Sequence, residues 1–207
     1  MKISNCNIQY QKSGFKLTVP KLTLKINKIN CLVGDNGCGK STLLKQIMLD
    51  ECEHDIPSKM MLLQKPYIFT GSVLNNLKLV KKLCPQSKID VTVLLDELNL
   101  SNLLNQRARL LSGGQRQRLA FALVILSDYD LIILDEPFNN IDINSQQLMT
   151  GVMKRYKKTY LLVSHKMNLA RKIGDYFILM DEGQIVAEGE HTIFEQNEKL
   201  KLLMEME

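Results

Sequence analysis

The residues with the clearest capacity for chemistry form a glycine-rich run after a short apolar segment. Residues 28–33 have the composition of a buried strand, and residues 34–42 read Gly-Asp-Asn-Gly-Cys-Gly-Lys-Ser-Thr. Glycines allow a tight turn whose backbone N–H groups point into one concavity, and a helix that starts there adds the positive end of its dipole. Such a loop is typical of sites for nucleoside triphosphates. The expected contacts come from Gly34, Asn36, Gly37, Cys38, Gly39, Lys40, Ser41 and Thr42.

Two members of this run, and two carboxylates further along, have more specific roles. Lys40 can reach the β- and γ-phosphates, and the hydroxyl of Ser41 can bind Mg²⁺. A second apolar segment, residues 131–134, ends in Asp135 and Glu136. Because ligands of α/β sheets bind at the carboxyl ends of the strands, we expect Asp135 to hold Mg²⁺ and Glu136 to polarise an attacking water. General-base catalysis of that kind contributes about 10²–10⁴-fold to a rate.

A third run, residues 111–118, combines a capping residue with two glycines. Ser112 can cap a helix, and Gly113 and Gly114 leave the backbone N–H groups next to Gln115 accessible. This run is a second anion-binding element, on a different part of the chain from the first. Two such elements suggest a composite site in which each copy of a dimer closes over the other's nucleotide.

The spacing of apolar residues predicts the elements that must position these side chains. Short strands are expected at the N-terminus, with turns at Ser13-Gly14 and Pro20-Lys21, and apolar strands then alternate with helices. This alternation indicates an α/β fold: a mostly parallel sheet flanked by helices, with a small N-terminal antiparallel β region. Residues 71–126 are expected to be an inserted helical subdomain, with the third run near its end, inside a single domain of residues 1–207. The predicted strands are 3–10, 15–19, 22–26, 28–33, 60–63, 131–134, 159–164 and 176–180.

Composition excludes several classes of protein. The 207 residues are 45% hydrophobic and 24% charged, with a formal net charge of +5, which excludes wholesale disorder and fibrous repeats. No apolar run reaches the roughly 18 residues of a membrane span, and the N-terminus lacks the apolar core of a signal peptide. The five cysteines are odd in number and lack a C-x-x-C pair, so we expect a reduced, cytoplasmic protein with no structural disulfide or zinc site. The mild positive charge does not indicate nucleic acid.

In their order along the chain, the three runs resemble the motifs of the ATP-binding cassette (ABC) ATPases, and the similarity covers nearly the whole chain. Residues 34–42, 131–136 and 111–115 are similar to the family's Walker A, Walker B and signature motifs. The resemblance implies a P-loop NTPase core. It also implies that Gln64 contacts Mg²⁺ and the water, that His165 contacts the γ-phosphate, and that Asp142 lies at a dimer interface. Tyr10 would stack on adenine, with Phe15 as the nearby alternative.

The resemblance further implies hydrolysis of ATP, with Mg²⁺, between two copies arranged head to tail. The chain would be the ATP-binding subunit of a transporter, attached to the cytoplasmic face of the cell membrane through an integral membrane permease. An extracytoplasmic solute-binding protein is a further expected partner. An apolar cluster at the start of the helical insertion would either contact the permease or belong to the core of the subdomain; it consists of Tyr67, Ile68 and Phe69. Residues 64–77 are similar to ATPases of oxyanion importers, such as those for tungstate.

Two alternatives remain at this point. A soluble ABC ATPase that is not coupled to transport, such as the iron–sulfur assembly type, is also a single cassette. The second alternative is a P-loop metabolite kinase, but that class of protein does not account for residues 111–115 or His165.

The segment of residues 49–60 is shorter than the one that ABC ATPases usually carry there, so we expect part of the family's strand subdomain to be trimmed. The sequence leaves the direction of transport, the cargo and the permease open.

Overall fold

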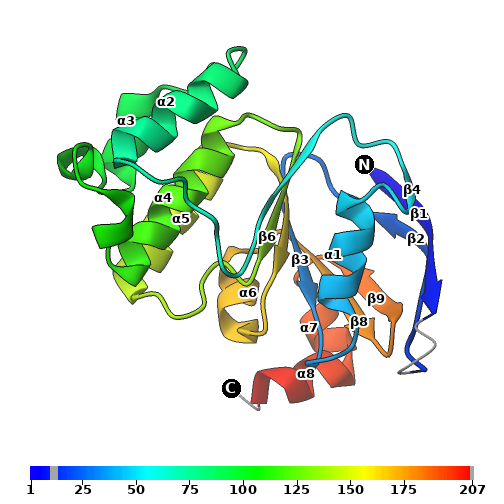
Figure 1. Ribbon diagram of the computed structural model, residues 1–207. Helices are drawn as coiled ribbons and strands as arrows, with labels where there is room; N and C mark the ends of the chain where they lie inside the picture. The colour runs from blue at the N-terminus through cyan, green and yellow to red at the C-terminus, as the bar shows by residue number, and fades with distance from the viewer. Residues whose placement is uncertain (10–13, 206–207) are drawn as a thin grey trace.

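A six-stranded sheet forms the centre of the protein in the computed structural model, which describes residues 1–9 and 14–205 (Figure 1). The strand order is β5-β6-β7-β3-β8-β9, and all neighbours are parallel except β8 and β9. The strands are β3 (Ile29–Val33), β5 (Lys59–Leu62), β6 (Leu131–Asp135), β7 (Thr159–Val163), β8 (Tyr176–Asp181) and β9 (Gln184–Gly189). The predicted mostly parallel α/β sheet is therefore confirmed, and β9 is a strand that the sequence pattern did not predict.

The two faces of this sheet pack against different partners. On β7, Tyr160 and Leu162 belong to one hydrophobic core together with the helices α4 and α5, whereas Leu161 and Val163 belong to a second core with α1. Burial on both faces explains why β3 and β7 are apolar at nearly every position. The helices outside residues 71–126 are α1 (Lys40–Met48), α5 (Ile143–Arg155), α6 (Met167–Ile173), α7 (Ile193–Gln196) and α8 (Glu198–Glu205).

A small antiparallel sheet of β1 (Lys2–Gln9), β2 (Lys16–Thr23) and β4 (Glu53–His54) packs on the second core. The prediction of two strands separated at Pro20-Lys21 was wrong, because β2 continues through Pro20. Proline has no N–H to donate, but β2 is an edge strand that pairs only with β1, so no ladder hydrogen bond is lost on the other side. The ladder also skips Asn5, whose φ is 56°.

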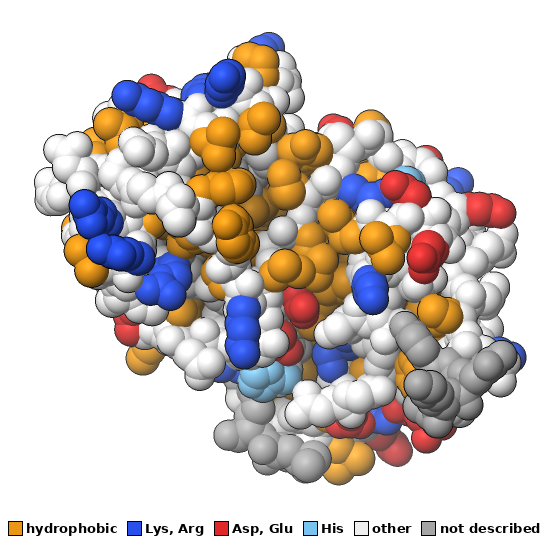
Figure 2. All heavy atoms as spheres, in the orientation of Figure 1, with side chains coloured by type: hydrophobic (Ala, Val, Ile, Leu, Met, Phe, Trp, Pro, Cys, Tyr) orange, Lys and Arg blue, Asp and Glu red, His pale blue; other side chains and the backbone are white. Residues whose placement is uncertain are grey.

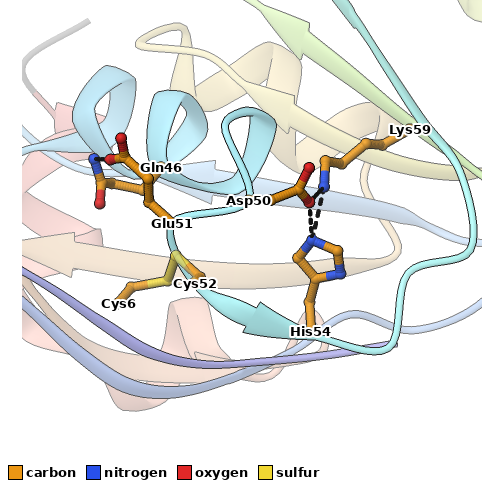
Figure 3. The surroundings of a disulfide bond; sticks show 7 residues. All are labelled: Cys6, Gln46, Asp50, Glu51, Cys52, His54 and Lys59. Atoms are coloured by element: carbon orange, nitrogen blue, oxygen red, sulfur yellow. Dashed lines mark hydrogen bonds and ion pairs between the residues drawn. A yellow bond between two sulfur atoms is a disulfide. The ribbon is translucent and has the colours of Figure 1, made fainter.

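A disulfide links Cys6 of β1 to Cys52, which directly precedes β4 (Figure 3). The expectation of no structural disulfide was wrong. The two cysteines are 46 positions apart in sequence, but the pairing of β1 with β4 brings their Cα atoms to 4.7 Å, within the range that a disulfide requires. The odd count reflects the remaining three cysteines, which are buried free thiols: Cys31, Cys38 and Cys84.

Residues 71–126 are largely helical, as predicted, and connect β5 to β6. They form α2 (Val73–Leu83), α3 (Val91–Glu97), two short 3₁₀ turns (Ser101–Leu103 and Ala108–Leu110) and α4 (Gly113–Leu126). Ser72 caps α2 and Asp90 caps α3 by accepting backbone N–H bonds. In the part of the chain that the structure describes, no helix is long and apolar enough to cross a membrane.

Candidate functional site

The glycine-rich run forms the sharp connection from β3 to α1. Gly34 and Gly39 have φ values of 145° and 109°, which other residues rarely adopt. A Cβ on Gly34 would lie 2.1 Å from the carbonyl oxygen of Met180, and one on Gly39 would lie 2.7 Å from Cζ of Phe15. Close packing therefore requires glycine at both positions. Gly39 is the N-cap of α1 and has no side chain to cap it, so the first N–H groups of the helix can face an anion.

Lys40 and Cys38 lie inside this loop. The ammonium group of Lys40 is buried and donates to the carbonyl oxygens of Gly34 and Asp35, at 2.8 Å each. Cys38 is also buried, 3.9 Å from that ammonium group. Burial raises the pKa of the Cys38 thiol, and the nearby Lys40 only partly opposes that effect. Cys38 is thus an uncharged filler of the loop, and Lys40 provides the positive charge.

The carboxyl ends of β3, β6 and β7 meet beside this loop and enclose a cleft of about 450 Å³. The glycine-rich run contributes its backbone and polar side chains, and the segments that follow β5, β6 and β7 contribute two carboxylates, two amides and an imidazole. The cleft is lined by Asn36, Gly37, Gly39, Lys40, Ser41, Thr42, Gln64, Asp135, Glu136, Asn139, Val163 and His165. Four segments that are far apart in sequence therefore converge on one cleft. Asn139 is an additional lining residue, and the only sequence signal for it was its position three residues after Glu136.

Glu136 and His165 form a coupled pair at the mouth of β6 and β7. Nδ1 of His165 lies 2.9 Å from Oε2 of Glu136, and the backbone N–H of His165 donates to the same oxygen at 3.3 Å. Glu136 itself has a φ of 49° and donates its N–H to the carbonyl of Val163. The carboxylate is mostly buried and lines the cleft, and both contacts from His165 are made to its Oε2.

Oxygen donors suited to Mg²⁺ lie on the same cleft. The pKa of Asp135 is raised by its burial and by the neighbouring charge of Glu136, while Lys40 acts in the opposite direction. A divalent cation would stabilise the ionised form of the Asp135 carboxylate. The oxygens of Asp135, Ser41 and Gln64 are the hard ligands that Mg²⁺ prefers. Among the described residues, no cluster of three or more His, Cys, Asp or Glu side chains could hold a metal ion alone. Phosphate oxygens are the usual complement in such sites.

The run Ser112–Gln115 does not line this cleft. It begins α4 with a capping box: Oγ of Ser112 accepts the N–H of Gln115 at 3.3 Å, and Oε1 of Gln115 accepts the N–H of Ser112 at 2.9 Å. The predicted cap is confirmed. A Cβ added to Gly113 would meet no atom within 4 Å, so the backbone there faces open space.

Gly114 packs against a side-chain network at the start of α5. A Cβ there would lie 2.8 Å from Oδ2 of Asp142, which is the N-cap of α5. Asp142 accepts hydrogen bonds from the backbone and hydroxyl of Ser145 at 2.8 and 2.7 Å, and Arg118 donates to the same hydroxyl. These bonds from Ser145 hold the pKa of Asp142 below its ordinary value, with Arg118 adding a smaller effect. Sequence reasoning missed Arg118, whose spacing only places it one turn beyond Gly114.

One predicted nucleotide contact falls on a residue that the structure does not describe. Tyr10, the expected adenine-stacking residue, lies outside the described residues. The alternative, Phe15, contacts the phosphate loop at Gly39.

Comparison with known proteins gives one family. Residues 17–139 match the family described as ABC transporter. The thiamine import ATP-binding protein ThiQ of Haemophilus ducreyi is 33% identical over 183 residues, covering 76% of this chain and 85% of that protein. The lactococcin-A transport/processing ATP-binding protein LcnC of Lactococcus lactis is 28% identical over 93% of this chain, which spans 31% of LcnC. A solved ATP-binding subunit of an ABC transporter has the same fold, with a TM-score of 0.84 at 22% identity and coverage of 99% and 98%.

The matched region begins at β2 and includes the phosphate loop, the signature run, and the strand that ends in Asp135 and Glu136. The chain therefore belongs to the ABC transporter family and carries its ATP-hydrolysing, ATP-binding region.

Proposed function

We propose that two copies of this chain hydrolyse two ATP molecules in composite sites and thereby drive a separate membrane permease. The observation that carries the proposal is the separation of the two phosphate-binding elements. The phosphate loop lines the cleft, whereas Ser112–Gln115 lies outside it, with Gly113 facing open space. A second copy placed head to tail would bring its signature run over the cleft of the first.

Six side chains in the cleft then have defined tasks. Lys40 and the N-terminus of α1 bind the phosphates, and Ser41, Gln64 and Asp135 hold Mg²⁺, which neutralises phosphate charge when bound. Glu136 accepts a proton from the attacking water, and His165 orients Glu136 and approaches the γ-phosphate. Asp142 lies beside Gly114, so it would reach the facing copy together with the signature run.

Complementation between two inactive variants tests the composite site. Lys40→Ala disables the phosphate loop and Gly114→Val disables the signature run, because its side chain would clash with Asp142 and Ser145. A mixed dimer contains one site with both defects and one site with neither. Mixing the two purified variants should therefore restore up to about a quarter of wild-type turnover, since random pairing gives half mixed dimers with one intact site each. Continued inactivity of a mixture that demonstrably forms mixed dimers would contradict the proposal.

The permease is proposed to dock on the apolar surface where α2, α4 and β5 meet. Figure 2 shows hydrophobic side chains gathered over this part of the molecule. Tyr67, Leu83 and Leu63 are exposed by 74%, 67% and 51%, and Tyr67 packs edge-on against Phe69 with ring centroids 5.4 Å apart. They line an apolar groove of about 510 Å³. Large exposed aromatic and aliphatic side chains of this kind are typical of protein interaction sites.

Copurification in detergent tests this docking surface. Tyr67→Lys should abolish recovery of a polytopic membrane protein with the tagged chain, while ATP binding by the purified chain stays unchanged. Val186→Lys, on the half-exposed edge strand β9, is the matched control and should retain the partner. Equal recovery with both variants would contradict docking at this surface, and recovery of no membrane partner by the wild type would favour an ATPase that is not coupled to transport.

The permease, together with any solute-binding protein that delivers the solute to it, determines which cargo is transported. The similarity of residues 64–77 to ATPases of oxyanion importers favours an oxyanion such as tungstate. The names of the relatives specify thiamine and petrobactin import and lactococcin transport for those proteins. Identification of the copurified permease, followed by binding of radioactive tungstate or of a competing oxyanion to its solute-binding protein, tests this cargo.

A further inference from the structure

The last helix of the described chain touches the phosphate loop through one cation. Nζ of Lys199 on α8 lies 2.6 Å from Oδ2 of Asp181 and 3.4 Å from Oδ2 of Asp35. Asp35 is the second residue of the glycine-rich run, and Asp181 ends β8. These two carboxylates raise the pKa of Lys199, the bond to Asp181 contributing most. One ammonium group therefore contacts two carboxylates and offsets one of their two negative charges, at the edge of a loop that must bind a polyanion.

The position of α8 is fixed independently of this ion pair. Leu200, the next residue, is completely buried in the main hydrophobic core, and Leu203 and Met204 pack against the same core. In Figure 1, α8 runs below the sheet, on the side where the loop leaves β3. Lys199 is thus presented to the loop by an anchored helix rather than by a freely moving segment.

Asp35 also connects Lys199 to the ATP-binding lysine. Its carbonyl oxygen accepts a hydrogen bond from Nζ of Lys40 at 2.8 Å and the N–H of Cys38 at 3.3 Å. On the Asp181 side, the turn after β8 is bonded to the loop as well, because the N–H of Gly183 donates to the carbonyl of Cys38 at 2.8 Å. Lys199 therefore bridges the two segments whose backbones shape the concavity around Lys40.

We propose that Lys199 is a positioning residue of the ATP site, which sets the affinity for the triphosphate by neutralising Asp35 and holding it against the β8–β9 turn. Without the cation, two uncompensated carboxylates would repel the phosphates and each other. Exposed ion pairs of this kind are modest in strength, so the role is one of tuning. It concerns ATP binding by a single chain, so it stands or falls separately from the two-copy site proposed above.

Substitution of Lys199 by Met is the direct test, with ATP and ADP as the ligands. Lys199→Met should weaken binding of ATP about two- to fivefold at low ionic strength, raise KM by the same factor and leave kcat unchanged. Binding of ADP, which carries less phosphate charge, should weaken less, and the difference should shrink in high salt. Lys199→Arg should retain wild-type affinity. Lys201→Met removes an exposed lysine two residues further on and serves as the matched control.

A second variant separates this electrostatic role from a structural one. Adding Asp35→Asn to Lys199→Met removes the carboxylate that the cation neutralised, so affinity for ATP should return close to the wild-type value. Unchanged ATP affinity in Lys199→Met would overturn the proposal. So would a loss that is insensitive to salt, equal for ATP and ADP, and not rescued by Asp35→Asn, because that pattern indicates a disturbed fold.

Discussion

The residues proposed to form the ATP site lie in two regions that are built in different ways. The first region is carried by the main sheet: the phosphate loop, Asp135, Glu136 and His165 follow strands that are neighbours or next neighbours in the order β6-β7-β3. The second region is the start of α4, where Ser112 and Gln115 cap each other and Gly114 packs on the network around Asp142. Backbone pairing over many residues fixes the first region, and a few side-chain hydrogen bonds fix the second.

This difference implies that the two regions contribute differently to ATP binding and to turnover. The sheet-borne region collects the phosphate loop, the proposed proton acceptor and the proposed Mg²⁺ ligands in one cleft of one chain. The helix-borne region offers backbone N–H groups at its start and contributes no residue to that cleft. We therefore expect binding of ATP to depend on the first region alone and turnover to depend on both.

The largest expected effect is on turnover in the sheet-borne region. Glu136→Gln removes the proton acceptor but retains the shape and the hydrogen bonds of the side chain, so turnover should fall by about 10²-fold or more while ATP still binds. Steady-state release of phosphate and equilibrium binding of ATP measure the two quantities. Glu195→Gln, an exposed carboxylate on α7, is the control. Turnover near the wild-type rate in Glu136→Gln would contradict the assignment of Glu136 as the proton acceptor.

The next effect is on the stability of the small antiparallel sheet, which packs on the same core as α1 of the sheet-borne region. Reducing the Cys6–Cys52 disulfide opens a closed loop of 46-residue separation, which should lower the free energy of unfolding by about 2–4 kcal/mol. Urea denaturation with and without a thiol reductant measures the change. Hydrogen exchange should accelerate more in β1, β2 and β4 than in α4 and α5. The double variant Cys6→Ser/Cys52→Ser is the control, because reductant should not shift it further; exchange that accelerates equally in α4 would show that the two regions are not separable.

The smallest effect belongs to the helix-borne region. Asp142→Ala removes the cap of α5 and should lower Tm by about 2–4 °C at neutral pH, whereas Asp142→Asn retains a capping side chain and should change Tm less. The folded pKa of Asp142 lies below 3.8, so its contribution is present above that pH and is lost as the pH falls through the folded value. Calorimetry should therefore find the gap between wild type and Asp142→Ala closing below about pH 3.8. A gap that persists unchanged in acid would mean that the carboxylate charge is not the stabilising group.

Sequence reasoning predicted the sheet-borne region well because its signals are local. Each motif directly follows an apolar strand, so the pattern of Leu131–Asp135 already places Glu136 at a strand end. The alternation of strands and helices likewise predicted the parallel sheet, and residue types predicted the cap at Ser112.

The features that sequence reasoning missed depend on pairings between distant segments. Cys6 and Cys52 meet only because a two-residue strand pairs with β1, and Pro20 is tolerated only because β2 is an edge strand. The contacts of Arg118 and Lys199 are made by long, flexible side chains, which have no characteristic spacing to the residues they reach. β9 alternates exposed and half-buried residues, with no fully apolar run to mark it.

The strand order has a consequence for the synthesis of the chain. β3, which leads into Lys40, and β6, which leads into Glu136, do not pair with each other; each pairs with β7, which lies between them. β7 begins at Thr159, so a growing chain contains both motifs well before it contains the strand that joins them. At about 5–20 residues per second of translation, the ribosome must add roughly two dozen more residues after Glu136 before the cleft can form. A chain that stops short of β7 would carry every Walker residue without a site in which they meet.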